Sequence, residues 1–235
     1  MEQTETLQTL STREKMKLFL EVTGDMNPAH HDLEYCLKKG FKDVVVPGMF
    51  SASALSRFAP ASNKIGFDFR DFVYPDDELT STMPDGVILT SYVNQLKQVV
   101  VELYDNFGNR IILGSNMEIS GKNPEINKAV TLDNLNKFKL ATGIEDNQRA
   151  LRMFSASLIP AALTSHYCTD GIYRSQKLIF YNQPLIRDTF QIYSKVASKK
   201  GTSDKGFIYQ LLNFCYSDKK LIFKGMATCL CDRDL

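Results

Sequence analysis

The feature that most constrains the fold of this chain is an internal repeat. The segment Phe19-x-x-Val22-Thr23-Gly24 recurs as Phe138-x-x-Ala141-Thr142-Gly143, which begins 119 positions later. In each copy a threonine and a glycine follow the phenylalanine, and a glycine in this place commonly stops a helix. A single match of this kind arises by chance, so the order of further landmarks decides whether the chain is a repeat.

Later landmarks recur in the same order at a constant, shorter spacing. Phe69 corresponds to Phe180 and Asp77 to Asp188, and the members of both pairs are 111 positions apart. The second copy is therefore shorter by eight residues, the difference between 119 and 111. The sequence predicts two tandem units of similar structure, with a deletion in the second unit before Phe180.

Each unit has the pattern of a buried helix followed by strands. The capping-box pattern Ser11-x-x-Glu14 predicts a helix that stops at Gly24, and residues 49–58, rich in small side chains, predict a buried helix. A buried helix followed by antiparallel strands is an α+β arrangement. The strand-like runs of the first unit are residues 65–73, 78–83, 87–102 and 110–119, with a hairpin turn at 105–109.

A polar segment separates the two units. Residues 121–131 are mostly polar and contain Pro124, which is typical of a linker. We therefore expect one unit over residues 1–120 and a second unit over residues 132–235. A chain of 235 residues is long enough to bury the core of such a structure.

The first unit carries a carboxylate and an imidazole at a turn that the second unit lacks. Asp25 and His30 lie on either side of Asn27-Pro28, and the residue before a proline disfavours the helical conformation. Their side chains can therefore converge on one small volume. A purely structural interpretation is also open, in which Asp25 bonds turn amides and His30 packs in the core. The second unit has Ile144 at the corresponding position and no histidine before His166.

The motif of the first unit resembles the signature of a known family. The spacing Gly24-Asp25-x-Asn27-Pro28-x-His30, followed by Pro47-Gly48-Met49, is similar to that of the MaoC-like (R)-specific enoyl-CoA hydratases and 3-hydroxyacyl dehydratases. The resemblance covers residues 10–120 in pattern and departs from the family at Ala29, where a larger aliphatic residue is usual. It implies a double hot-dog fold, in which two tandem units each wrap an antiparallel sheet around a central helix.

The second unit is expected to support the first rather than to catalyse. In some two-copy relatives the second unit is the active one, whereas here the motif lies in the first. The central helix of the second unit is expected to begin at Ile159-Pro160, and the unit is expected to complete the sheet and part of the acyl pocket. Its Tyr167, Ile172 and Tyr173 are interpreted as packing or tunnel lining, and His166 as structural.

The resemblance implies that Asp25 and His30 are catalytic. Hydration of an enoyl thioester needs a positioned water, a group that accepts its proton and a donor to C2, and the two side chains together can supply both transfers. The Gly48 amide, at a helix N-terminus, is placed to act as the oxyanion-hole donor to the thioester oxygen. Asn27 is expected to hold the turn rather than to contact the ligand. Ser56 matches a serine that relatives carry near the site, and a structural role on a packed helix is equally open for it.

The expected function is therefore reversible addition of water to a trans-2-enoyl thioester in fatty-acid or related acyl metabolism. The substrate would be carried as a CoA or acyl-carrier-protein thioester, and no cofactor or metal is implied. Two alternatives remain open: a hot-dog acyl-thioesterase, and a non-catalytic acyl-binding protein with a vestigial site. The paired carboxylate and imidazole favour hydration over hydrolysis, and their joint presence argues against a vestigial site.

Composition excludes other classes. Twenty-eight basic and 27 acidic residues give a formal net charge of +1, so no global field attracts nucleic acid. The N-terminus lacks the basic and apolar regions of a signal peptide, and no run is apolar enough for a membrane span.

The five cysteines include no metal-type pair and are expected to be reduced, mostly buried thiols. We expect a cytoplasmic protein that is a monomeric pseudo-dimer or a homodimer.

Overall fold

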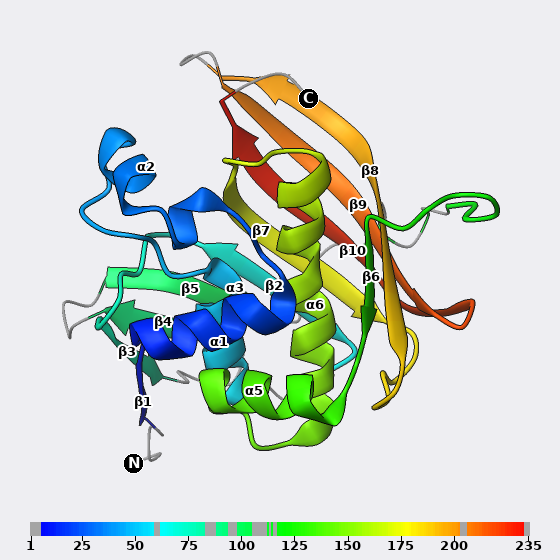
Figure 1. The fold of residues 1–235 in the computed structure, drawn as a ribbon, viewed down its shortest axis with the longest axis horizontal. Coiled ribbons are helices and arrows are strands. Elements are labelled where there is room, and N and C mark those ends of the chain that lie inside the picture. Colours follow the sequence, from blue (N-terminus) through cyan, green and yellow to red (C-terminus); the bar gives the residue numbers. More distant parts are fainter. Residues whose placement is uncertain are drawn as a thin grey trace.

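The computed structural model describes residues 6–58, 62–82, 88–93, 98–104, 112, 114, 117–202 and 206–232. Within these residues, an antiparallel sheet of ten strands curves around the helices (Figure 1). The strands are β1 (Thr6–Leu10), β2 (Lys64–Phe69), β3 (Glu78–Thr82), β4 (Ile88–Val93), β5 (Gln98–Tyr104), β6 (Ile126–Ala129), β7 (Ile172–Phe180), β8 (Thr189–Gly201), β9 (Phe207–Ser217) and β10 (Lys220–Cys231). The helices are α1 (Arg13–Thr23), α2 (Leu33–Lys38), α3 (Gly48–Leu55), α5 (Leu132–Thr142) and α6 (Asn147–His166), with 3₁₀ turns η1 (Pro28–His30) and η2 (Ser56–Phe58).

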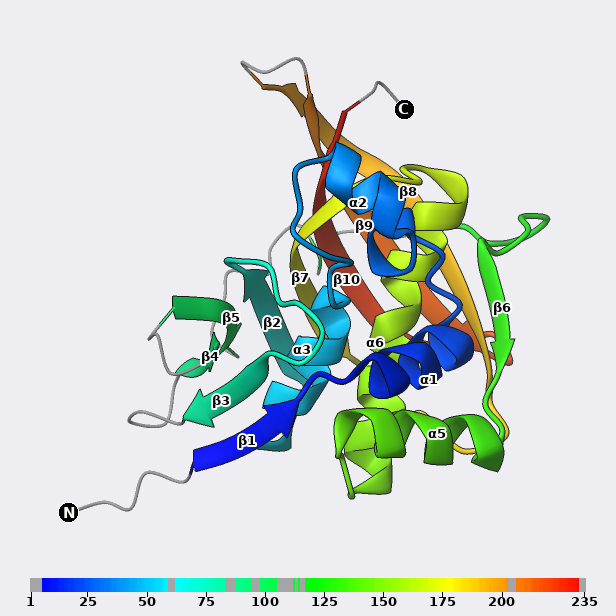
Figure 2. The same cartoon turned by 60° about the vertical axis from the view of Figure 1, so that its left-hand side comes forward.

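The order of the strands shows the two units directly. It runs β1-β3-β4-β5-β2 through the first half and continues as β7-β10-β9-β8-β6 through the second. The two halves meet where β2 pairs with β7, and each half has the same order from that seam to its outer edge. The edge strands β1 and β6 lie on opposite sides of the molecule, with α1 and α5 between them (Figure 2). The expected α+β arrangement is present, and one continuous sheet joins its halves.

The first helix of each unit begins and ends in the same way. Thr12 caps the start of α1 and Thr131 caps the start of α5, and each side chain accepts a hydrogen bond from an amide three residues later. Gly24 and Gly143 end these helices with φ of 74° and 73°, a conformation that glycine adopts without strain. The cap of α1 lies one residue after the predicted Ser11, because the Ser11 hydroxyl instead donates to a carbonyl just before β3 at 2.8 Å.

The turn before β3 recurs before β8. Asp77 accepts a hydrogen bond from the Tyr74 amide at 2.9 Å, and Asp188 accepts one from the Leu185 amide at 2.8 Å. The residue before each aspartate has a positive φ, 68° in the first unit and 81° in the second. The spacing of 111 positions between the two aspartates therefore marks a structural repeat, as the sequence predicts.

The landmark phenylalanines of the repeat meet at the centre of the core. The rings of Phe19 on α1 and Phe138 on α5 have centroids 5.6 Å apart, and both side chains are buried. Each ring also packs edge-on against the central helix of its own unit, Phe19 on Phe50 of α3 and Phe138 on Phe154 of α6. The two central helices are thus joined by an aromatic cluster to which each unit contributes two phenylalanines.

The central helix of the second unit begins earlier than predicted. The sequence pattern places its start at Ile159, whereas α6 begins at Asn147 and continues through Pro160. A proline inside a helix leaves the carbonyl four residues earlier without its usual donor. Gln176 of β7 supplies a donor, because its Nε2 binds the Ala156 carbonyl at 3.1 Å. Neither α6 nor another helix in the described part of the chain is long and apolar enough to cross a membrane.

Three predictions about strands need correction. Residues 87–102, expected as one strand, contain the antiparallel pair β4 and β5. Residues 126–129, expected in the linker, form the edge strand β6, which pairs with β8. Ile112 and Gly114, within the strand expected over 110–119, are helical. The strand β6 was missed because a short edge strand has one partner and one buried face at most, so its residues carry little of the hydrophobic alternation that marks a strand. The hairpin turn expected at 105–109 lies outside the described residues.

Candidate active site

The motif of the first unit forms a turn between α1 and α2. After Gly24 the chain leaves the helix, and Asn27 takes φ and ψ of −59° and 121°, as expected for a residue before proline. Asn27 Oδ1 accepts a hydrogen bond from the Ala29 amide at 3.0 Å, which fixes the start of η1. Asp32 then caps α2, accepting a hydrogen bond from the Tyr35 amide at 2.9 Å.

The structure brings the predicted catalytic pair together. Asp25 Oδ2 and His30 Nε2 are 3.7 Å apart, and the two side chains are 5% and 11% exposed. This separation is too long for a direct hydrogen bond. One water oxygen can lie about 2.8 Å from both atoms, within hydrogen-bond distance of each. The two side chains are therefore arranged to bind one small ligand together rather than to hydrogen-bond to each other.

The tautomer of His30 follows from its second contact. His30 Nδ1 lies 2.7 Å from the carbonyl oxygen of Val45. A carbonyl oxygen only accepts, so Nδ1 carries the hydrogen, and in the neutral ring Nε2 is then an acceptor. It is this nitrogen, Nε2, that faces Asp25.

The two oxygens of Asp25 have different surroundings. Oδ1 accepts hydrogen bonds from the Asn27 amide at 3.2 Å and from the Thr164 hydroxyl at 3.3 Å. Oδ2 faces His30. The carboxyl group is thus anchored through one oxygen and turns the other toward the imidazole.

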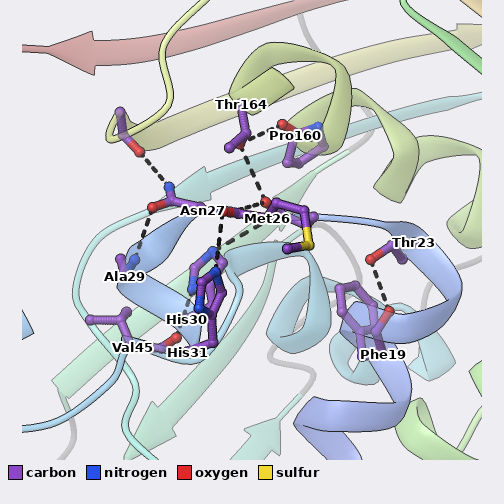
Figure 3. A network of polar contacts seen from close by, with 12 residues as sticks. Phe19, Thr23, Met26, Asn27, Ala29, His30, His31, Val45, Pro160 and Thr164 are labelled. Atoms are coloured by element: carbon purple, nitrogen blue, oxygen red, sulfur yellow. Dashed lines mark hydrogen bonds and ion pairs between the residues drawn. The ribbon is translucent and has the colours of Figure 1, made fainter. Parts of the chain in front are cut away.

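The site lies on the seam between the two halves. Thr164 belongs to α6 of the second unit, and the Asn27 side chain donates to the Gly171 carbonyl of the same unit at 2.9 Å. Figure 3 shows Thr164 and Pro160 on the helix facing Asn27 and His30 on the turn. The sequence gives no signal for Thr164 or Gly171, because 139 residues separate Asp25 from the threonine and neither belongs to a motif.

A cavity of about 350 Å³ opens from this pair. Both halves line it, and its lining combines apolar side chains with polar and charged ones. A volume of this size is typical of a small-molecule site. The apolar walls include Val46, Met49, Phe69, Leu163, Ile172 and Cys229.

Gly48 lines the same cavity at the first position of α3. The first amides of a helix have no acceptor within the helix, so they are available to a ligand with partial negative charge. A Cβ at this position would lie 3.0 Å from two ring carbons of Phe69. Glycine is therefore the residue that permits both the close approach of Phe69 and access to the amide.

The predicted supporting residues differ in their positions. Asn27 holds the turn and joins the halves, as its two contacts above show. Ser56 is buried but donates to the Ser53 carbonyl at 2.7 Å and is not among the residues that line the cavity. Ser51, further toward the start of α3, lines the cavity, and its buried hydroxyl has no partner within the described structure.

The second unit contributes two weakly acidic groups that stay neutral. Burial raises the pKa of the Tyr173 phenol well above its usual value, and the charge of Asp25 raises it further. Burial also raises the pKa of the Cys229 thiol to about 12. The Tyr173 hydroxyl donates to Gln176 at 2.6 Å. Neither group is therefore ionised near neutral pH, and Cys229 is poorly suited to act as a nucleophile.

The expectation of five reduced thiols is wrong for one pair. Cys168, just after α6, and Cys231, at the end of β10, form a disulfide with Cα atoms 6.2 Å apart. The residues are 63 positions apart in sequence, and only the fold brings their backbones within bridging distance. Cys36, Cys215 and Cys229 are free and buried, as expected.

Charged side chains of both signs lie at the cavity. The basic residues Lys39, Arg70 and Arg174 line it together with acidic residues. Lys39 forms ion pairs with Asp170 and Asp232, two of those acidic residues. The net charge of the lining therefore does not by itself select an anionic carrier group.

Part of the chain is similar in sequence to known proteins. Residues 2–84 match the family model described as MaoC like domain. A UPF0336 protein of Streptomyces coelicolor is 27% identical over 115 residues, which cover 43% of this chain and 77% of that protein. The matched part of the chain includes the turn with Asp25 and His30 and the start of α3.

Solved structures resemble the whole chain. A conserved hypothetical protein from Mycobacterium tuberculosis with a double hotdog fold has a TM-score of 0.70 at 10% identity, over 98% of this chain and 96% of that one. A MaoC-like dehydratase from Phytophthora capsici has a TM-score of 0.58 at 11% identity, with the same coverage of 98% and 96%. At these identities the likeness concerns the fold, and the predicted double hot-dog fold is confirmed.

Proposed function

We propose, from the MaoC-like domain that this chain carries within its double hot-dog fold, that the protein is an (R)-specific enoyl-thioester hydratase, or in reverse a 3-hydroxyacyl-thioester dehydratase. The observation that carries the proposal is the pair of acceptors, Asp25 Oδ2 and His30 Nε2, held 3.7 Å apart in the lining of a cavity that both halves form. Two acceptors at this distance orient a water molecule through both of its hydrogens and leave an oxygen lone pair free to attack.

The reaction proposed for this pair balances in protons. The water oxygen bonds to C3 as one of its protons passes to the pair, and the electrons of the double bond move toward the thioester. A proton then returns from the pair to C2, which restores the thioester and the starting protonation of Asp25 and His30. Each positioned proton transfer contributes on the order of 10² to 10⁴-fold to the rate.

Charge that develops on the thioester oxygen needs a donor, and we assign this role to the Gly48 amide. The amide lies at the N-terminus of α3 and at the cavity wall. A preorganised amide favours the enolate-like transition state over the neutral thioester. The acyl chain would lie along the apolar walls, and the carrier, CoA or acyl-carrier protein, would remain outside.

Crotonyl-CoA tests this function directly. We expect the absorbance of the conjugated thioester to fall when the protein is added, with no release of free thiol measured in parallel. Thiol release would instead show an acyl-thioesterase, the alternative reaction on this fold. If neither signal changes, both catalytic assignments are wrong and acyl binding without chemistry is the remaining interpretation.

We predict that Glu145→Gln and His166→Ala leave turnover of crotonyl-CoA within about twofold of the wild type. Glu145 is exposed and follows Ile144, the buried residue that stands where the first unit has Asp25. His166 is exposed and its Nε2 contacts the Glu125 carbonyl at 2.9 Å. Measured kcat and KM check the prediction. A loss comparable to that of Asp25→Asn in either variant would mean that the second unit is catalytic.

A further inference from the structure

Thr164 has one hydrogen and two acceptors within reach. Its Oγ1 lies 2.9 Å from the Pro160 carbonyl of its own helix and 3.3 Å from Asp25 Oδ1. The side chain is buried, with 6% of its surface exposed. A hydroxyl donates one hydrogen bond, so it binds one of these oxygens at a time. A hydrogen bond to an ionised carboxylate is the stronger of the two kinds.

Other buried hydroxyls of α6 show what a purely local role looks like. Ser157 donates to the Met153 carbonyl at 2.7 Å and Ser155 to the Arg152 carbonyl at 2.8 Å, both within the helix. Such hydrogen bonds give the hydroxyl an acceptor within its own helix and make no contact with another helix or strand. Of these three hydroxyls, that of Thr164 also contacts the catalytic turn, and it lines the cavity.

The two donors that contact Asp25 Oδ1 belong to different elements. The Asn27 amide binds Oδ1 from within the turn, at 3.2 Å, and so holds this oxygen from one direction. A donor from a different element adds a second direction. Oδ1 is then held between the turn and α6, and Oδ2 is directed at His30 Nε2.

We propose that Thr164 is a positioning residue of the active site, which fixes Asp25 through Oδ1 so that Oδ2 alone takes the proton of the attacking water. The proposal rests on the hydratase function proposed above. It assigns the two oxygens of one carboxylate to different tasks, anchoring and proton transfer. It also gives the second unit, which lacks the motif, a direct part in arranging the catalytic group.

The kinetic test compares Thr164→Val with Thr164→Ser. Valine keeps the approximate shape and removes the hydroxyl, whereas serine keeps the donor. Because misplacement of a reacting group by about 1 Å costs up to about 100-fold, we expect Thr164→Val to lower kcat for crotonyl-CoA by about 10- to 100-fold. KM should stay within about twofold, since Thr164 acts on Asp25 rather than on the acyl chain. Thr164→Ser should restore most of kcat.

Ser157→Ala is the matched control. It removes a buried hydroxyl from the same helix, bonded to its own helix carbonyl, and should leave kcat unchanged. Thermal unfolding of each variant separates a loss of kcat from a loss of fold. If Thr164→Val does not fold, Thr164→Ala takes its place in the comparison.

A spectroscopic measurement tests the same contact without turnover. The Asn27 amide donates to the oxygen that Thr164 shares, so its proton resonance should move in Thr164→Val, return in Thr164→Ser and stay in place in Ser157→Ala. An unmoved Asn27 resonance in Thr164→Val, or an unchanged kcat, would overturn the role of Thr164. A wild-type protein that does not hydrate crotonyl-CoA would contradict the proposed function instead, and the Asn27 resonance would still decide the contact.

Discussion

Asp25→Asn and His30→Ala should each lower kcat for crotonyl-CoA by about 100-fold or more, with the fold intact. Asparagine cannot accept a proton, and its amide group would place a donor where Oδ2 now faces His30. Alanine at position 30 removes the second acceptor of the water. Both residues lie on the turn between α1 and α2 rather than in a layer of the core, so the loss should appear in kcat and not in thermal unfolding.

His31→Ala is the control for the imidazole. His31 is the neighbour of His30 in sequence, is exposed, and places Nε2 3.2 Å from the Met26 carbonyl rather than at Asp25. It should retain wild-type turnover. If the two histidine variants lose activity equally, or if Asp25→Asn turns over at the wild-type rate, the catalytic assignment is wrong.

Gly48→Val should reduce turnover by about 100-fold, the loss typical of a missing oxyanion donor. The added Cβ would lie 3.0 Å from Cδ1 and Cε1 of Phe69, and the branched side chain would also cover the amide at the start of α3. Kinetics with crotonyl-CoA measure the effect, and circular dichroism shows whether the helix remains.

The double variant Gly48→Val/Phe69→Leu separates two causes of that loss. A smaller side chain at position 69 relieves the collision with the ring but leaves the valine beside the thioester. Continued low turnover in the double variant supports a direct contact between the Gly48 amide and the substrate. Recovery would show that displacement of Phe69 explains the effect, and that the oxyanion donor lies elsewhere.

Local features of the site were open to prediction because neighbouring residues determine them. Asn27-Pro28 forces the extended backbone that separates Asp25 from His30, and the glycines after α1 and α5 stop those helices. The repeat allowed the second unit to be predicted from the first, because two copies with the same caps and turns form similar units. The family resemblance added the hot-dog topology that these local rules do not determine.

Contacts made across the seam were not open to prediction. Thr164 and Gly171 reach the motif from the other half, and Cys168 meets Cys231 only when α6 and β10 are in place. The helix through Pro160 breaks a local rule, and it does so because Gln176 of a neighbouring strand replaces the missing donor. In each case the deciding partner is distant in sequence and is of a residue type that occurs in many other roles.

Because β2 and β7 pair within one chain, assembly of the site does not depend on the protein concentration. A site built from two separate chains exists only while those chains are associated, so the fraction of assembled sites falls as the protein is diluted. Here Asp25 and Thr164 belong to one polypeptide, which holds their halves at an effective concentration on the order of millimolar or higher. The peptide linkage therefore replaces an association equilibrium, and the halves that form the site always occur in equal number. One half can therefore lack the motif while every molecule still contains the half that carries it.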